Sequence, residues 1–255
     1  MAEQTLYETR AAAAWIELDR REKRNALTPA MVGEIRRHLE VASGDDGVRA
    51  VVITGRGKAF CAGADLEKGQ GLADGSRRGT HPFASMLQEI QSFPKPVIAA
   101  VNGPAFGGGL GLMAAADIVI ARSGVRFSFS EVKLGLIPAM ISVVVLPRIG
   151  AHHARWLFLT GRKFGADEAL SYGLVHRVVP EGELHRAVEE EVAEIGEGGP
   201  LAVAAAKRLI REVESLDQNE AFRRASAWFR EVSESEEGRE GMAAFVEKRL
   251  PRWRS

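Results

Sequence analysis

The sequence predicts a mixed α/β protein in which a core of strands and helices, residues 1–199, precedes a helical C-terminal part, residues 200–255. In the first part, short β-branched runs alternate with helical periodicity, and glycine-rich segments follow two of these runs. Beyond Gly196–Pro200 only long amphipathic patterns remain, so we expect no further strand there. With 255 residues, 45% of them hydrophobic, the chain is long enough to bury a sizeable core.

The first cycle of strand and helix occupies the N-terminal fifth of the chain. Leu6–Asp19 is typical of strand material, with apolar residues beside charged ones. Thr28 and Pro29 predict a helix start, because a hydroxyl at the N-cap is followed by proline at the first helical position. Apolar residues then recur at helical spacing as far as Ser43, and Val48–Thr54 reads as a short buried strand.

A second cycle follows a segment of different character. Gly69–Pro82 is polar and rich in glycine, which predicts a loop of the kind that forms a lid or a pocket wall. Helix, strand and helix are then expected at Met86–Phe93, Pro96–Val101 and Leu110–Ala116. The remaining core elements are strands at Asp117–Ala121, Val125–Ser130 and Val175–Val179, and helices around Ala151–Thr160 and Ala166–Tyr172.

The C-terminal part consists of three helical patterns, at Leu201–Val213, Asn219–Phe229 and Gly238–Arg249. Their apolar faces have no strand left to cover. We therefore expect these faces to pack against another surface, such as a neighbouring subunit.

Composition excludes several classes of protein. Lys plus Arg equals Asp plus Glu at 34 each, so no net field favours nucleic acid or an anionic membrane. The N-terminus lacks the basic and apolar regions of a signal peptide, and no apolar run is long enough for a membrane span. Cys61 is the single cysteine, which excludes an internal disulfide. We expect a cytoplasmic protein.

Two glycine-punctuated segments, Ala59–Leu66 and Asn102–Gly111, are the most informative feature. Each follows a strand and leads towards a helix, so backbone N–H groups point outward where the helix dipole favours negative charge. Two such ends at one point would hold an oxyanion between them. One glycine usually suffices for a tight turn, so the run of three at Gly107–Gly109 indicates close approach of a ligand or another backbone.

Part of the second segment also matches a dinucleotide fingerprint. Gly109-x-Gly111-x-x-Ala114 has the required spacing, and Glu131 follows about twenty residues later. The context argues against a nicotinamide or flavin site, because five residues separate the strand from the first glycine. No Gly-Lys-Ser/Thr follows, which excludes a P-loop, and the histidines lack ligand spacing for zinc.

Charged residues near these segments have ordinary as well as functional interpretations. Glu131 lies in the apolar stretch Phe127–Pro138, which could raise its pKa into a range useful for proton transfer. The basic run Arg20–Arg24 is either a solvated loop or a site for the phosphates of an anionic ligand. Together with the loop at residues 69–82, Ala139–Val144 is expected to form the pocket wall.

Read together, these segments resemble the enoyl-CoA hydratase/isomerase (crotonase) superfamily over essentially the whole chain. Five motifs in the family's order carry the resemblance. They are the first CoA-contacting loop at Arg21–Leu27, the oxyanion segments Ala59–Leu66 and Asn102–Gly109, the second catalytic segment Ser130–Pro138 and the C-terminal signature Glu240–Arg249.

The resemblance implies a spiral of ββα units with a C-terminal helical trimerisation part, assembled as a homotrimer or a hexamer. It gives the thioester-oxygen contacts to the N–H groups of Ala64 and Gly108 and implies an acyl-CoA thioester as substrate, with no metal or redox cofactor. Coenzyme A, which is part of the substrate, would lie along Lys23, Arg24, Ala26, Ala62, Asp65 and Leu66. Phe229, with Phe245 and Lys248 of a neighbouring subunit, would lie near its nucleotide end.

One departure from the family's pattern limits the chemistry. Typical two-glutamate hydratases carry a glutamate on the helix after the triple glycine, where this chain has Gly111. Glu131, which matches the second glutamate, is then the only acid left at a family position. Three interpretations remain open: a hydratase with a single glutamate, a Δ3,Δ2-enoyl-CoA isomerase in which that glutamate shuttles a proton, and a catalytically weak acyl-CoA-binding scaffold. Resemblance to methylglutaconyl-CoA hydratase-like members favours hydration of a branched or carboxylated substrate.

Overall fold

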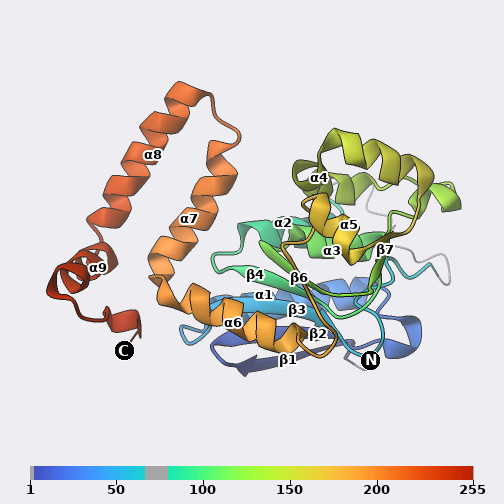
Figure 1. The fold of residues 1–255 in the computed structure, drawn as a ribbon, viewed down its shortest axis with the longest axis horizontal. Coiled ribbons are helices and arrows are strands. Elements are labelled where there is room, and N and C mark those ends of the chain that lie inside the picture. Colours follow the sequence, from blue (N-terminus) through green and yellow to red (C-terminus); the bar gives the residue numbers. More distant parts are fainter. Residues whose placement is uncertain (1–2, 67–79, 255) are drawn as a thin grey trace.

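A six-stranded sheet forms the centre of the computed structural model, which describes residues 3–66 and 80–254 (Figure 1). The strands lie in the order β1-β2-β3-β4-β6-β9. Only β1 and β2 pair antiparallel; every other neighbouring pair is parallel. The strands are β1 (Thr5–Arg10), β2 (Ala13–Leu18), β3 (Ala50–Gly55), β4 (Val97–Val101), β6 (Ile118–Arg122) and β9 (Arg177–Val179).

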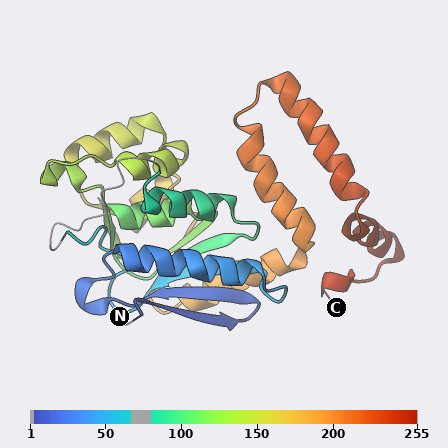
Figure 2. The same ribbon diagram turned by 180° about the vertical axis from the view of Figure 1, so that it is seen from behind.

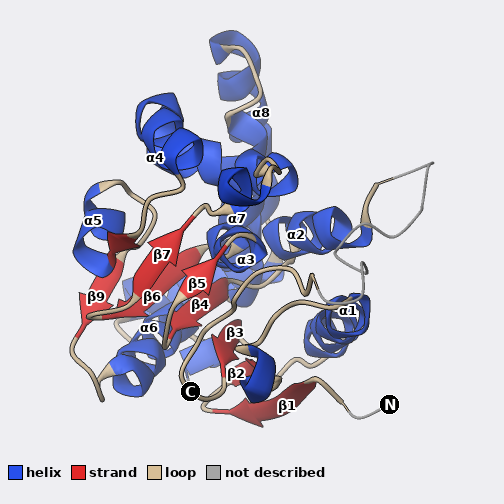
Figure 3. Ribbon diagram, turned by 90° about the vertical axis from the view of Figure 1, so that its right-hand side faces the viewer, coloured by secondary structure: helices blue, strands red, loops and turns tan. Residues whose placement is uncertain are grey.

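Helices cover both faces of this sheet (Figure 3). Since side chains alternate along a strand, Ala14 and Ile16 enter the larger hydrophobic cluster while Ala13 and Trp15 enter the smaller one. The larger cluster lies under α1 (Pro29–Ser43), α2 (Pro82–Ser92) and α3 (Gly108–Ala115); the smaller lies under α6 (Leu184–Glu197). The sheet is therefore buried on both sides, as parallel sheets are.

A second, three-stranded sheet lies beside the first. It consists of β5 (Ala105–Phe106), β7 (Arg126–Ser128) and β8 (Phe164–Gly165), in that order. Next to it are α4 (Ala139–Thr160), which is interrupted at Gly150, and α5 (Ala166–Ser171). The short 3-10 turns are η1 (Arg21–Lys23), η3 (Glu131–Leu134) and η4 (Arg252–Arg254).

Most elements lie where the sequence predicts them, and the exceptions have physical reasons. The strand material expected at Leu6–Asp19 is divided into two strands, β1 and β2, because Ala11 and Ala12 form a tight turn with φ of 47° and 58°. Hairpin turns with positive φ usually carry glycine or asparagine, so two alanines gave no turn signal. The helix α6 was not predicted, nor was the N-terminal half of α4, whose apolar residues lack a polar face.

The C-terminal helices α7 (Pro200–Val213), α8 (Gln218–Ser233) and α9 (Glu236–Glu247) stand beside the core (Figures 1 and 2). Lys207 of α7 connects them to it: its Nζ donates to the carbonyls of Ile90 and Lys95, at 3.1 Å each, and lies 2.6 Å from Oδ2 of Asp117. The division at residue 199 stays a prediction. None of the described helices has the length and apolarity needed to cross a membrane.

Candidate active site

The first glycine segment is held against the loop that precedes α1. Leu27 and Ala64 form a parallel β-bridge, in which the N–H of Leu27 donates to the carbonyl of Gly63 at 2.7 Å and the N–H of Asp65 donates to the carbonyl of Leu27 at 2.9 Å. These two bonds engage the carbonyl of Gly63 and the N–H of Asp65, the residues on either side of Ala64. The N–H of Ala64 itself therefore points away from Leu27 and is available to another acceptor.

The second segment contains a turn at Gly107, just before α3, whose backbone conformation requires glycine. Gly107 has a φ of 49°, and α3 begins at the next residue. A Cβ on Gly109 would lie 2.4 Å from the carbonyl oxygen of Cys61, so the two segments approach too closely for any side chain there. Gly108 is the first helical residue, and its N–H has no acceptor within the helix. The run of three glycines is thus explained by turn geometry and by close backbone approach, as the sequence indicated.

The two segments bring the N–H groups of Ala64 and Gly108 together. A Cβ built on Gly108 would lie 3.8 Å from the nitrogen of Ala64, and one built on Gly63 would lie 3.5 Å from the nitrogen of Gly108. Within residues 3–66 and 80–254, neither N–H donates to a backbone carbonyl. Two neighbouring N–H donors without an acceptor are the geometry of an oxyanion hole.

Glu131 lies directly beside this pair of donors. It is the first residue of η3, after β7, and its Oε1 is 3.2 Å from the position of a Cβ on Gly107. The side chain is half-buried, and its Oε2 is buried without a hydrogen-bond partner among the described residues. Burial raises the pKa of Glu131, against a smaller lowering by a backbone hydrogen bond. A carboxyl group of this kind is suited to accept and return a proton.

The place that a side chain on Gly111 would occupy is already filled. A Cβ there would lie 2.3 Å from Cγ2 of Ile141 and 3.0 Å from its Cβ. Ile141 belongs to the N-terminal half of α4, whose buried face packs against α3. An apolar side chain therefore stands where an acid at position 111 would have to fit.

These groups share one largely apolar cavity of about 440 Å³. The carboxyl of Glu131 and the two N–H donors lie in walls that are otherwise mostly hydrophobic, which strengthens electrostatic interactions inside. The described lining residues are Ala62, Gly63, Ala64, Leu66, His81, Phe83, Gly107, Gly108, Ser130, Glu131, Leu134, Leu136, Ile137, Pro138, Ala139, Met140 and Ile141.

Nearly the whole chain matches one family of enzymes. Residues 8–255 fit the model described as enoyl-CoA hydratase/isomerase. The chain belongs to the enoyl-CoA hydratase/isomerase family. It is 37% identical over 253 residues to the carnitinyl-CoA dehydratase of Proteus mirabilis, with 96% of each chain covered.

Solved structures of enoyl-CoA hydratases have the same fold. The enzyme from Shewanella pealeana superposes with a TM-score of 0.91 at 32% identity, covering 98% of this chain and 96% of that one. The enzyme from Bacillus anthracis gives a TM-score of 0.89 at 32% identity, with 98% of each chain covered. The expected crotonase-like fold with a helical C-terminal part is thereby confirmed.

The structure brings together most residues that the family resemblance connects with coenzyme A. Ala62 and Leu66 line the cavity. The N–H of Ala62 donates to the carbonyl of Arg24 at 3.0 Å, so the loop that carries Lys23, Arg24 and Ala26 runs beside the first glycine segment. Arg20 fixes this arrangement, because it donates to the carbonyl of Ala26 at 2.6 Å and to Oδ2 of Asp65 at 2.8 Å. Part of the basic run is thus structural.

Three residues expected near the nucleotide end of coenzyme A do not line the cavity of this chain. Phe229 on α8 and Phe245 on α9 are 77% and 86% exposed, and Lys248 is the C-cap of α9. Figure 1 shows both helices apart from the sheet. A role for these residues in the site would require a neighbouring subunit.

Two cavity residues, Ile141 and His81, lie in the segments that were expected to form the pocket wall, but no individual role was predicted for either. Ile141 lies in the wall expected at Ala139–Val144, but its contact with Gly111 was not foreseen. His81 lies within the loop at residues 69–82, which was also expected to contribute to this wall. Residues 69–79 of that loop lie outside the described part of the chain, whereas His81 is the N-cap of α2 and Pro82 its first residue. The signal available was a polar residue followed by proline, which is typical of a helix start. No group of three metal-ligating side chains occurs among the described residues.

Proposed function

We propose that this family member is an enoyl-CoA hydratase, which adds water across the 2,3 double bond of an enoyl-CoA thioester. One observation supports this more than any other: the N–H groups of Ala64 and Gly108 lie beside a carboxyl group, Glu131, in one apolar cavity. Membership of the family and similarity to a dehydratase point the same way, because dehydration is the reverse of this reaction.

In the proposed reaction, Glu131 removes a proton from water as the oxygen of that water attacks C3 of the enoyl group. The double-bond electrons move to C2 and the thioester, so negative charge develops on the thioester oxygen. The N–H groups of Ala64 and Gly108 donate to this oxygen and stabilise the enolate. The same carboxyl group then returns the proton to C2, which gives the 3-hydroxyacyl-CoA product.

The filled space at Gly111 supports a mechanism with a single carboxyl group. Ile141 leaves no room for a second acid at that position, so Glu131 acts first as base and then as acid. A raised pKa suits this double role, because a carboxyl group with an ordinary pKa would return the proton less readily. No resident cofactor enters any step, since coenzyme A arrives as part of the substrate.

We also propose how the substrate is held. Lys23, Arg24, Ala26, Ala62, Asp65 and Leu66 would contact coenzyme A, because their loops run side by side at the cavity. The exposed aromatic residues Phe229 and Phe245 support assembly into a homotrimer or a dimer of trimers, in which they and Lys248 reach a neighbouring site. A branched, methylglutaconyl-CoA-like acyl group stays a prediction of the resemblance.

The test is a panel of three substrates with the purified enzyme and identification of each product. The panel contains crotonyl-CoA, 3-methylglutaconyl-CoA and a 3-enoyl-CoA. We expect hydration of the first two without a shift of the double bond. Conversion of the 3-enoyl-CoA alone would assign the isomerase reaction instead, and binding of all three without turnover would assign a scaffold.

A further inference from the structure

Arg20 binds a peptide group that is itself hydrogen-bonded to the first glycine segment. Its Nη1 donates to the carbonyl of Ala26 at 2.6 Å, and its Nη2 donates to Oδ2 of Asp65 at 2.8 Å. Only 16% of the Arg20 side chain is exposed, and Ala26 is buried. The guanidinium is therefore a largely shielded positive charge that is bound to one backbone carbonyl.

The peptide group between Ala26 and Leu27 connects this charge with the glycine segment. In a trans peptide group the carbonyl and the N–H point in opposite directions. The carbonyl accepts from Arg20, so the N–H of Leu27 faces the other way, where it donates to the carbonyl of Gly63 at 2.7 Å. The next peptide group, between Gly63 and Ala64, repeats the pattern: its carbonyl faces Leu27, and the N–H of Ala64 lies on the opposite side.

Two consecutive peptide groups thus connect a cation with one donor of the oxyanion hole. A hydrogen bond to a carbonyl polarises the peptide group and makes its own N–H a stronger donor, so bonds in such a chain strengthen one another. Every bond runs in the same direction, from the guanidinium towards the thioester oxygen. The positive charge should therefore matter most in the transition state, when that oxygen becomes negative.

The second donor, the N–H of Gly108, is supported in a different way. The carbonyl of the same peptide group belongs to Gly107 and accepts from the N–H groups of Leu110 and Gly111, at 2.9 and 3.2 Å. The dipole of α3 therefore lies behind this donor. Ala64 lies in a β-bridge instead, and the chain of hydrogen bonds behind its N–H leads to the guanidinium.

We infer that Arg20 is a positioning residue of the reaction, which orients and polarises the N–H of Ala64 through these two peptide groups. The inference rests on the proposed hydratase function and adds to it a residue that does not touch the reacting atoms. Loss of Arg20 should weaken stabilisation of the enolate, which lowers kcat. The loop that Arg20 holds also carries the expected contacts to coenzyme A, so the test needs a direct readout of the thioester carbonyl.

The experiment measures the C=O stretching frequency of enzyme-bound butanoyl-CoA by isotope-edited infrared spectroscopy. The ligand carries carbon-13 at the thioester carbonyl and has no double bond to hydrate. Stronger hydrogen-bond donors polarise this carbonyl and lower its frequency. Spectra recorded at saturating ligand report the oxyanion hole and not the affinity.

Three variants and one control are compared with the wild type. Arg20→Lys keeps the positive charge, and Arg20→Gln removes it. The double variant Arg20→Gln/Asp65→Asn removes both charges, so that no carboxylate is left unpaired if the single variant fails to fold. Arg56→Gln is the matched control, because the ion pairs of Arg56 are with Glu17 and Asp19 and involve neither glycine segment.

We expect a lower frequency in the wild-type complex than in buffer, and a partial return towards the buffer value in Arg20→Gln and in the double variant. Their kcat for crotonyl-CoA should fall about tenfold, less than the loss of about 10²–10³-fold when a donor is removed outright. Arg20→Lys should retain more of both quantities, and Arg56→Gln should match the wild type.

Three results would overturn the inference: a wild-type frequency after loss of the Arg20 charge, no better retention in Arg20→Lys than in Arg20→Gln, or an equal change in Arg56→Gln. A wild-type complex whose carbonyl frequency equals that in buffer, or a wild-type enzyme that does not hydrate crotonyl-CoA, would instead overturn the proposed function.

Discussion

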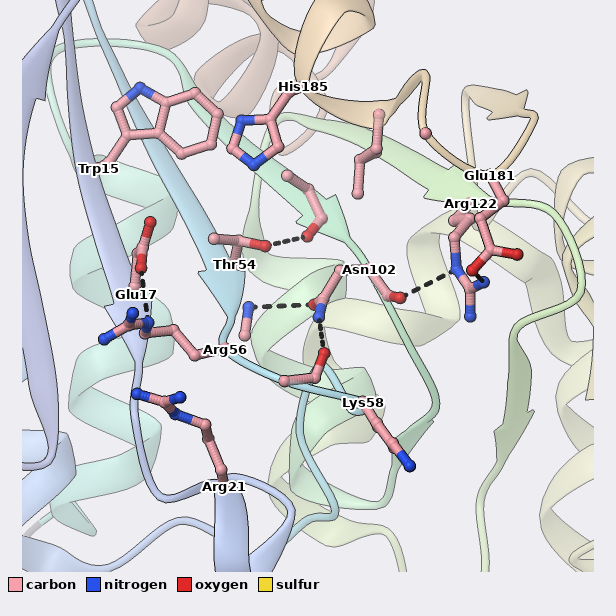
Figure 4. A pocket seen from close by; sticks show the side chains of 15 residues that line it. Trp15, Glu17, Arg21, Thr54, Arg56, Lys58, Asn102, Arg122, Glu181 and His185 are labelled. Atoms are coloured by element: carbon pink, nitrogen blue, oxygen red, sulfur yellow. Dashed lines mark hydrogen bonds and ion pairs between the residues drawn. The ribbon is translucent and has the colours of Figure 1, made fainter.

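Two cavities on opposite faces of the central sheet differ in how their polar groups are satisfied. The cavity with Glu131 measures about 440 Å³ and lies on the face covered by α2 and α3. The other, of about 770 Å³, lies on the face covered by α6 and is lined by Trp15, Leu184 and His185 among others (Figure 4). The larger cavity is the more polar of the two, but Glu131 and the N–H groups of Ala64 and Gly108 lie in the smaller one.

In the larger cavity the polar groups bind one another. Asn102 accepts from the N–H of Gly55 and donates to the carbonyl of Gly57, both at 3.1 Å, while Arg56 pairs with Glu17 at 3.3 Å. Figure 4 shows these contacts as dashed lines between residues of the cavity wall. An exception is Trp15, whose Nε1 is buried without a partner; its ring stacks on His185.

In the smaller cavity the polar groups are left without partners. The N–H groups of Ala64 and Gly108 and Oε2 of Glu131 have none among the described residues. Unsatisfied groups in an apolar cavity cost stability, and a substrate that satisfies them recovers that cost. The comparison teaches that unfulfilled hydrogen-bonding capacity, rather than size or polarity, marks the candidate site.

The largest expected effect comes from replacing one glutamate by glutamine in each of the two cavities and comparing the losses of activity. Glu131→Gln should lower kcat for crotonyl-CoA by about 10²–10⁴-fold, because the amide cannot accept the proton of water. Glu17→Gln, the matched change in the larger cavity, should leave kcat within about twofold, since Glu17 contributes only a partly exposed ion pair with Arg56. Steady-state kinetics of both variants test this prediction. Equal losses of kcat would mean that both cavities serve the reaction.

A second test removes one backbone donor. Gly108→Pro lacks the N–H at the first helical position, where proline fits, and should lower kcat by about 10²–10³-fold. Gly108→Ala adds a methyl group 3.3 Å from Cδ1 of Leu27 but keeps the N–H, so it reports the steric cost alone. Rates of crotonyl-CoA hydration are compared between the two. If the proline and alanine variants lose the same activity, the N–H of Gly108 is not an oxyanion donor.

A third test concerns the space beside Gly111. Gly111→Ala should cost about 1–3 kcal/mol of stability, because its methyl group would overlap Ile141. In an Ile141→Ala background the same change should no longer destabilise, since alanine favours the helix once the overlap is gone. Urea unfolding of the four proteins measures this coupling. An equal cost of Gly111→Ala in both backgrounds would show that Ile141 does not fill the space.

The smallest effect is expected in the pH dependence. Because burial raises the pKa of Glu131, kcat/KM should fall on acidification at a pH above the ordinary glutamate range near 4.3. The folded protein then binds the proton more tightly than the unfolded chain, so Glu131 lowers stability as pH rises through its folded pKa. The Tm of Glu131→Gln should therefore be higher than that of the wild type at pH 8 but not at pH 4. A gain independent of pH would contradict this.

Much of the fold and of the site could be predicted because the signals are local. Thr28 does accept from the N–H of Met31, at 3.1 Å, as its place before Pro29 predicts. The triple glycine and Glu131 lie in short motifs whose chemistry depends on neighbouring residues. The hairpin at Ala11 and Ala12 could not be predicted, because its positive φ angles are imposed by the pairing of β1 with β2 rather than by residue type.

The sequence by itself determined the α/β class, the two glycine segments and the absence of an acid at position 111. Only the tertiary structure decided that the N–H groups of Ala64 and Gly108 share one cavity with Glu131, that Ile141 occupies the space beside Gly111, and that His81 lies in the same wall. The physical reason is distance along the chain. Turns and caps are set by residues within a few positions of one another, whereas a site joins segments tens of residues apart, which come together only when the core packs.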